Sequence, residues 1–208
     1  MKTAASWLSL IVLVVVLFWP FPAFHIVPLG QASARDGWND FNAQAFAQQF
    51  WKTKLIPAFD QATDAAELLP ALEKDPKEAR SRFGHLPGMS STTFFLVKGT
   101  GEVVAVEDDG VRLRILTSAR ETEVLLHTGL LFGNTVRDGT GLIDPGQFPN
   151  SQRFNDIATE LNRIVEANVI PVLRKLAVPG RKVAFVGCAE LEEDETPRPL
   201  KVVPVKAE

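Results

Sequence analysis

The hydrophobic and polar positions divide the chain into three segments of different spacing, and the first is almost continuously apolar. No residue between Lys2 and Arg35 carries a fixed charge, and residues 4–24 are apolar with few interruptions. A membrane span requires roughly 20 apolar residues, whereas the apolar core of a signal peptide requires roughly 7–15. Residues 1–34 are therefore either a retained signal anchor, which the length favours, or a signal peptide cleaved near residues 32–34. Both alternatives place the rest of the chain outside the cytoplasm.

The second segment, residues 35–90, has the spacing of short helices followed by a linker. Apolar residues recur at intervals of three or four through most of it. Pro57 and Pro70 interrupt the pattern, and Asp75 followed by Pro76 has the form of a helix N-cap with proline in the first turn. We therefore predict a module of two or three short helices in this segment.

The third segment, residues 91–191, predicts strands around one long helix. Short apolar runs are separated by turn residues such as Asp108–Gly110, and one of these runs alternates strictly. A long amphipathic pattern begins after a capping residue at Asn150 or Ser151, and Pro171 is expected to kink its last turn. The expected strands are residues 94–98, 101–107, 111–115, 121–127 and 182–191.

The order of these elements is that of an α+β protein with an N-terminal membrane helix and a short helical module. Several antiparallel strands, a helix and a closing strand are the order of a small OB-like antiparallel β-barrel with one long helix before the last strand. Closing the strands into a barrel would remove their exposed edges. An open sheet packed on the long helix is the alternative. Residues 192–208, acidic and then proline-rich, are expected to form an extended or disordered tail.

Charge and cysteine content exclude several classes of function. The formal net charge of −3 offers no basic surface, so no nucleic-acid partner is expected. The single cysteine, Cys188, excludes an internal disulfide framework. It lies far along the chain, so no cysteine directly follows the apolar segment to carry a lipid. Phosphate-binding glycine loops, zinc motifs and nucleophile elbows are absent from the sequence, and His25, His85 and His127 are far apart. We therefore predict no cofactor, metal ligand or catalytic residue.

Polar, turn-forming and charged side chains are concentrated in residues 128–156, before and at the start of the long helix. Arg137 beside Asp138 could hold a sugar hydroxyl or a carboxylate, or it could tie the loop to the sheet by a salt bridge, which is the favoured alternative. An EF-type calcium loop from Asp138 is excluded because its twelfth residue is Pro149. Asn162, at the edge of the helix's apolar face, is expected either to reach back to this loop or to face solvent. The candidate ligand- or partner-binding residues are Asn134, Arg137, Asp138, Asp144, Asn150 and Gln152.

The chain resembles an uncharacterised bacterial family in six stretches, which read FHIVPL, FNAQAFAQQFWKTKLIPAFDQA, FLVKGTGEVVAV, GLLFGNTVRDG, FPNSQRFNDIATELNRIV and GRKVAFVGCAEL. Members of that family are described as predicted periplasmic lipoproteins and are often encoded beside sugar ABC transporters. The resemblance covers residues 24–191, and residues 133–138 mark it most strongly. It brings no established activity or catalytic residue, but it implies a link to carbohydrate uptake. Because this chain has no lipidation cysteine, an uncleaved N-terminal helix would replace the lipid.

These observations predict a non-enzymatic, extracytoplasmic, membrane-anchored accessory or binding protein. It would lie in a bacterial inner membrane through residues 4–24 with a periplasmic domain, or in the periplasm if the N-terminus is cleaved. Its partner would be a transporter component or a small polar ligand such as a sugar. The alternatives are a hydrolase-type enzyme with Asp138 and Asp144 as paired carboxylates, and a purely structural envelope protein. Ligand binding predicts an exposed Arg137, whereas a structural role predicts that Arg137 is buried in an ion pair.

Overall fold

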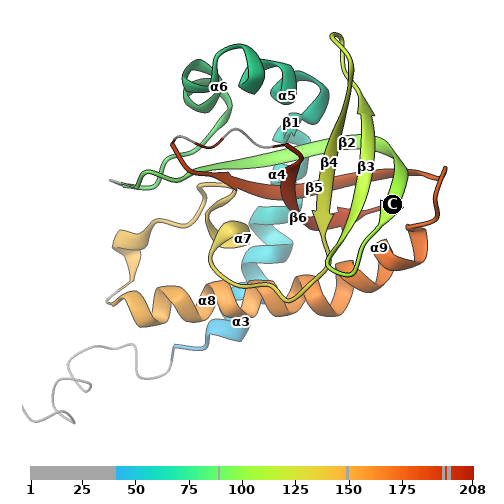
Figure 1. The fold of residues 1–208 in the computed structure, drawn as a ribbon. Coiled ribbons are helices and arrows are strands. Elements are labelled where there is room, and N and C mark those ends of the chain that lie inside the picture. Colours follow the sequence, from blue (N-terminus) through green and yellow to red (C-terminus); the bar gives the residue numbers. More distant parts are fainter. Residues whose placement is uncertain (1–40, 89, 149, 194, 196–197) are drawn as a thin grey trace, which may run out of the picture. The chain divides into compact units, whose positions relative to one another are not determined.

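A six-stranded sheet carries the fold, and helices lie above and below its strands in the view of Figure 1. The computed structural model describes residues 41–88, 90–148, 150–193, 195 and 198–208. These residues belong to one unit that runs from Phe41 to Glu208. The membrane segment expected at residues 4–24 lies outside the described residues. Within the described part, no helix has both the length and the hydrophobicity needed to cross a membrane.

Five of the six strands form a closed ring of paired strands. The pairing order is β1-β2-β3-β4-β6-β5, and β2 also pairs with β5. Neighbouring strands are antiparallel, except that β1 is parallel to β2 and β4 is parallel to β6. This is the OB-like strand order that the sequence predicted, completed by one more strand. The strands are β1 (Thr63–Asp64), β2 (Thr93–Val106), β3 (Gly110–Leu116), β4 (Glu121–His127), β5 (Lys182–Leu191) and β6 (Leu200–Ala207).

β2 is one long strand, although the sequence predicted two strands separated at residues 99–100. It pairs with β5 over residues 93–102 and with β3 from residue 102 onward. The glycines that suggested a break lie at close contacts between strands. A Cβ on Gly101 would lie 2.8 Å from the carbonyl oxygen of Arg114, and a Cβ on Gly99 would lie 3.2 Å from the ring of Phe185. Glycine therefore lets neighbouring segments of the protein approach β2 closely here, and it does not end the strand.

β6 lies in the segment predicted to be an extended or disordered tail, so that prediction was wrong. The strand pairs with β4 on one side and with β5 on the other. Its side chains Leu200 and Val202 are fully buried. Pro204, which argued against a strand, lies opposite Gly187, beside a register shift in the β5–β6 pairing. Proline is tolerated at such irregular positions. Two strands, rather than the one that was predicted, follow the long helix.

The helices are short before β2 and long before β5, as the sequence predicted. Asp75 caps α6 by accepting a hydrogen bond from the Glu78 N–H, and Asn150 caps α8 by accepting one from the Arg153 N–H. The long helix changes its winding through the π-helical turn η4, immediately before the expected kink at Pro171. The helices before β2 are α3 (Ala43–Phe50), the π-helical turn η1 (Trp51–Leu55), α4 (Ile56–Ala58), the 3₁₀ turn η2 (Phe59–Gln61), α5 (Ala65–Lys74) and α6 (Pro76–Phe83). Those between β4 and β5 are α7 (Thr135–Asp138), the 3₁₀ turn η3 (Pro145–Gln147), α8 (Ser151–Ile164), η4 (Val165–Val169) and α9 (Ile170–Leu176).

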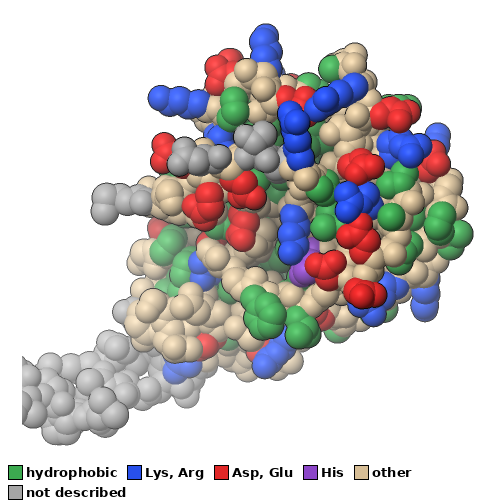
Figure 2. Space-filling model, in the orientation of Figure 1, with side chains coloured by type: hydrophobic (Ala, Val, Ile, Leu, Met, Phe, Trp, Pro, Cys, Tyr) green, Lys and Arg blue, Asp and Glu red, His purple; other side chains and the backbone are tan. Residues whose placement is uncertain are grey.

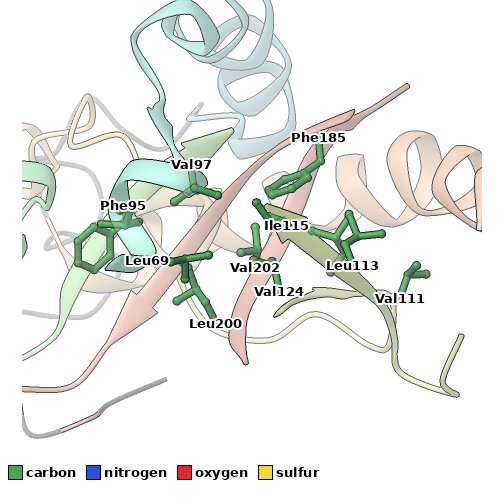
Figure 3. Packing of buried hydrophobic residues seen from close by; sticks show 14 of the residues in the cluster. Leu69, Phe95, Val97, Val111, Leu113, Ile115, Val124, Phe185, Leu200 and Val202 are labelled. Atoms are coloured by element: carbon green, nitrogen blue, oxygen red, sulfur yellow. The ribbon is translucent and has the colours of Figure 1, made fainter. Parts of the chain in front are cut away.

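The strands enclose the first of two hydrophobic clusters (Figure 3). Phe95 and Val97 of β2, and Leu113 of β3, are completely buried in it. Leu68 and Leu69 of α5 belong to the same cluster. Because α5 and the strands share one core, the boundary expected near residue 91 does not separate a helical module from a β-domain.

The second cluster lies between the outer side of the sheet and the helices α3 and α8. Ile157 and Leu161 of α8 are completely buried there, together with Cys188 of β5. Ala47 and Phe50 of α3 join them, and α3 packs against α8. The long helix is therefore fixed on the sheet by its apolar stripe, which leaves its polar stripe facing the loop that follows β4.

Candidate functional site

The short helix α7 lies directly on β5, and this contact sets the course of the loop between β4 and α8. The Thr135 hydroxyl donates a hydrogen bond of 2.7 Å to Glu190 of β5. Gly139 follows α7, and a Cβ there would lie 2.5 Å from the Sγ of Cys188, so a side chain would collide with the strand. The segment that marks the family resemblance most strongly is thus packed into the fold rather than displayed on it.

Arg137 and Asp138 form a buried ion pair, with 5% and 6% of their surfaces exposed. The Arg137 Nε donates to Asp138 Oδ1 at 2.7 Å, and a terminal nitrogen donates to Oδ2 at 2.8 Å. The other terminal nitrogen donates to the backbone oxygen of Phe154 and to Oδ1 of Asn155. The guanidinium also lies 3.5 Å from the centre of the Phe154 ring. This is the buried arrangement expected of a structural tie between α7 and α8.

The structure brings together only three of the six predicted site residues. Asn134 donates a hydrogen bond to Asp138, so Asn134, Arg137 and Asp138 form one cluster. The other three have local structural contacts. Asp144 accepts a hydrogen bond from the Gly146 N–H at the start of η3, and Asn150 caps α8. The Gln152 amide donates to Asp156 on the surface of α8.

The two carboxylates that a hydrolase would require have different surroundings. Both oxygens of Asp138 accept hydrogen bonds from Arg137, and the side chain is buried. Asp144 is exposed, and its Oδ1 is engaged at the start of η3. Asp138 is therefore held as the partner of Arg137, without a free oxygen directed to a substrate.

A hollow of about 580 Å³ lies beside this cluster, between the loop that follows β4 and the polar stripe of α8. We call it the α8 hollow. Asn162 is 7% exposed and donates from Nδ2 to the backbone oxygen of Gly133 at 3.1 Å, so it reaches back to the loop as predicted. Glu166 accepts from the Leu131 N–H at 3.0 Å. The polar lining consists of Asn134, Arg137, Asn155, Thr159, Asn162, Arg163 and Glu166.

Several hydrogen-bonding groups of the α8 hollow are not used within the described part of the chain. The Asn155 side chain accepts from Arg137 through Oδ1, which leaves its amide N–H groups available. The Asn162 side chain donates through Nδ2, which leaves its Oδ1 available as an acceptor. Arg163 pairs with Glu160, and its side chain is largely exposed. The hollow therefore offers both donors and acceptors to a small polar molecule.

Sequence reasoning missed most of this lining, although one signal was present. Residues 155, 159, 162 and 166 follow each other at intervals of four, three and four, which is the spacing of one helix face. Such a stripe beside an apolar face also occurs on any solvated helix surface. It becomes a candidate site only because the loop after β4 folds back over it.

Among the described residues outside this site, two groups have shifted pKa values. Complete burial raises the pKa of the Cys188 thiol to about 12, so the thiol stays protonated at neutral pH. Hydrogen bonds to Glu107, and then to Glu123, raise the pKa of Arg112 on β3. Among the described residues, no group of three or more His, Cys, Asp or Glu side chains is placed to hold a metal ion.

The strand order and the position of α8 define an α+β protein with OB-like topology. The chain belongs to the family described as "Predicted periplasmic lipoprotein (DUF2291)", whose model matches residues 12–208. It is also similar to a solved structure, an OB-fold protein (TM0957) from Thermotoga maritima. The two sequences are 28% identical, the TM-score is 0.72, and the match covers 81% of this chain and 98% of that one. No curated protein matches the sequence.

Proposed function

We propose that this chain is a non-enzymatic, extracytoplasmic binding protein that takes a small polar ligand in the α8 hollow. The observation that carries the proposal is the set of unused donors on Asn155 and the unused acceptor on Asn162, which both line this hollow. The volume of about 580 Å³ falls in the range of roughly 300–1,000 Å³ typical of small-molecule sites. The buried Arg137–Asp138 pair supports the site from behind, with Arg137 forming part of its lining.

The family description supports a location in the periplasm or at a membrane facing it. We infer that residues 4–24 hold the protein in the inner membrane, because they are long and apolar enough to span it. The one cysteine of the chain is Cys188, which is buried in β5 and cannot carry a lipid in the folded protein. An N-terminal apolar anchor would therefore replace the lipid anchor that the family description names.

We further propose an accessory role beside a carbohydrate transporter, with a sugar as the ligand. The support for this role is the family resemblance together with the mixed lining of the hollow. Amide groups and a threonine hydroxyl suit the hydroxyl groups of a neutral sugar, which both donate and accept hydrogen bonds. We take the ring of five strands to be the small closed barrel that carries this site.

A ligand screen by thermal unfolding tests the proposal. The full-length protein, in detergent, is unfolded with neutral sugars, sugar acids and divalent ions added separately. A ligand at one hundred times its dissociation constant stabilises the folded state by about 2.7 kcal/mol, which raises the melting temperature measurably. We expect a neutral sugar to raise it. If sugars, sugar acids and ions all leave the melting temperature unchanged, the small-ligand proposal is wrong.

A further inference from the structure

Two large apolar side chains project into solvent from the loop that follows β4. Leu130 is 74% exposed and Phe132 is 82% exposed, while Leu131 between them is buried, with 8% exposed. We call residues 130–132 the apolar ridge. Figure 2 shows hydrophobic side chains gathered on this face, where the loop between β4 and α7 runs in Figure 1. Single exposed apolar residues are common on protein surfaces. These two indicate a binding surface only if the loop holds them in a fixed position.

The ridge is fixed by hydrogen bonds on both sides. The Leu131 N–H donates to Glu166, and His127 Nε2 lies 3.2 Å from the backbone oxygen of Leu130. Before the ridge, Arg174 donates to the backbone oxygen of Thr128 at 3.0 Å. Behind it, Asn162 holds the backbone oxygen of Gly133. A loop tied at this many points presents its side chains in one arrangement, and this lowers the entropy lost when a partner binds.

A second hollow lies on the other side of the ridge. It measures about 440 Å³ and is lined by His127 at the end of β4 and by Lys201 and Val203 of β6. We call it the β6 hollow. Leu131 and Phe132 line both hollows, so the ridge separates them. One face of the protein thus carries a projecting phenyl ring and, directly beside it, a cavity larger than that ring.

We propose that this face binds a second copy of the chain, with Phe132 of each copy entering the β6 hollow of the other. A two-fold interface joins the same patch of both subunits and must be complementary to itself. A projection next to a cavity satisfies this requirement. Rotation about a two-fold axis places the projection of each copy against the cavity of the other. The interface is formed by the ridge and its two flanks, so this proposal does not rest on ligand binding in the α8 hollow.

The charges around the ridge favour a protein over a lipid surface. Arg163 and Glu166 line one hollow, while Glu190, Glu195 and Lys201 line the other. A loop that inserts into an anionic bilayer is typically surrounded by Lys and Arg, whereas a mixed polar rim is typical of protein interfaces. The strands of the ring pair on both sides, so association through a free strand edge has little opportunity.

The residues that line the two hollows, eighteen in all, come close to the number in a dimer interface of standard dimensions. Eleven residues line the α8 hollow and nine line the β6 hollow, with two residues common to both. Stable interfaces use roughly 20–30 residues on each side. The two exposed side chains alone would bury too little area, so both flanks of the ridge must contribute to the interface.

Sedimentation velocity of the full-length protein in density-matched detergent tests the proposal. We expect a reversible dimer, and we expect Phe132→Ser to weaken it by about a hundredfold or more, because both copies lose a buried aromatic anchor. Leu116→Ser is the matched control. Leu116 is 72% exposed at the end of β3 and belongs to neither hollow, so its loss should leave the dimer intact.

Three results would overturn the proposal. The wild type could remain monomeric at every concentration, the dimer could persist unchanged in Phe132→Ser, or Leu116→Ser could weaken it equally. The first result, combined with Phe132-dependent flotation on vesicles of anionic phospholipid, would assign the ridge to a membrane surface instead. Thermal unfolding of both variants checks that each is folded, which is expected because the two side chains are largely exposed.

Discussion

At the scale of single residues, the ion pair between Arg137 and Asp138 explains the course of the loop better than any ligand does. The guanidinium joins α7 to the first turns of α8 through Asp138, the Phe154 backbone and Asn155. Burying both charges is tolerable because each is paired and hydrogen-bonded. The pair therefore positions the loop.

Replacing Arg137 by alanine should lower the free energy of unfolding by about 3–5 kcal/mol, because Asp138 would remain buried without its partner. Urea denaturation measures the change. Arg163→Ala is the control, since that side chain is largely exposed and its loss should change stability by less than about 0.5 kcal/mol. An Arg137→Ala variant as stable as the wild type would show that the pair is not a structural tie.

Cys188 predicts a pH dependence at the alkaline end. Its pKa is about 12 in the folded protein against an ordinary value of 9.0, so folding favours the protonated thiol. Its contribution to stability is therefore complete below pH 9 and is lost as the pH rises toward 12. Urea denaturation between pH 9 and 11 should show a steeper loss for the wild type than for Cys188→Ala. Equal slopes would mean that the thiol is not desolvated as the structure indicates.

The sequence could identify residues with local roles but not those with distant partners. The caps at Asp75 and Asn150 follow from neighbouring residues, and both are confirmed. For Arg137, the sequence left a ligand contact and a salt bridge open, because burial depends on how α7 packs on β5. Asn155 and Thr159 were not among the candidate site residues, because only the returning loop distinguishes them from an ordinary solvated helix face.

At the scale of elements, the ring depends on its last strand. β6 joins β4 to β5, and without it the order β2-β3-β4 would remain open on one side. Local patterning underestimated this strand because the acidic residues before it and the prolines within and beside it resemble a tail. The same limitation split β2, since a glycine needed for close strand contact has the same local appearance as a strand break.

A pair of substitutions on β6 tests its place in the ring. Val202 is fully buried in the cluster inside the strands, whereas its neighbour Lys201 is exposed. Val202→Ala should lower the free energy of unfolding by about 2 kcal/mol, and Lys201→Ala should change it by less than about 0.5 kcal/mol. Guanidinium denaturation gives both values. If both substitutions were neutral, β6 would be the tail that the sequence suggested.

At the scale of the whole molecule, the order of antiparallel strands followed by a long helix and a further strand was within reach of the sequence. Alternating runs, tight turns and one long amphipathic helix determine most of the OB-like order. The place of β6 between β4 and β5 could not be predicted from the sequence. Its parallel pairing with β4 joins residues more than seventy positions apart and leaves no local signal. The α8 hollow arises at this level, where the long helix meets the loop that follows β4.

The most direct test of the central claim is to fill the α8 hollow and titrate. The sugar that gives the largest thermal shift would be titrated calorimetrically into Thr159→Trp and Gln152→Trp. Thr159 lines the hollow, whereas Gln152 lies two turns earlier on the same stripe of α8 and outside it. We predict that binding is lost in Thr159→Trp and unchanged in Gln152→Trp, with both proteins folded. Undiminished binding to Thr159→Trp would contradict the claim that this hollow is the binding site.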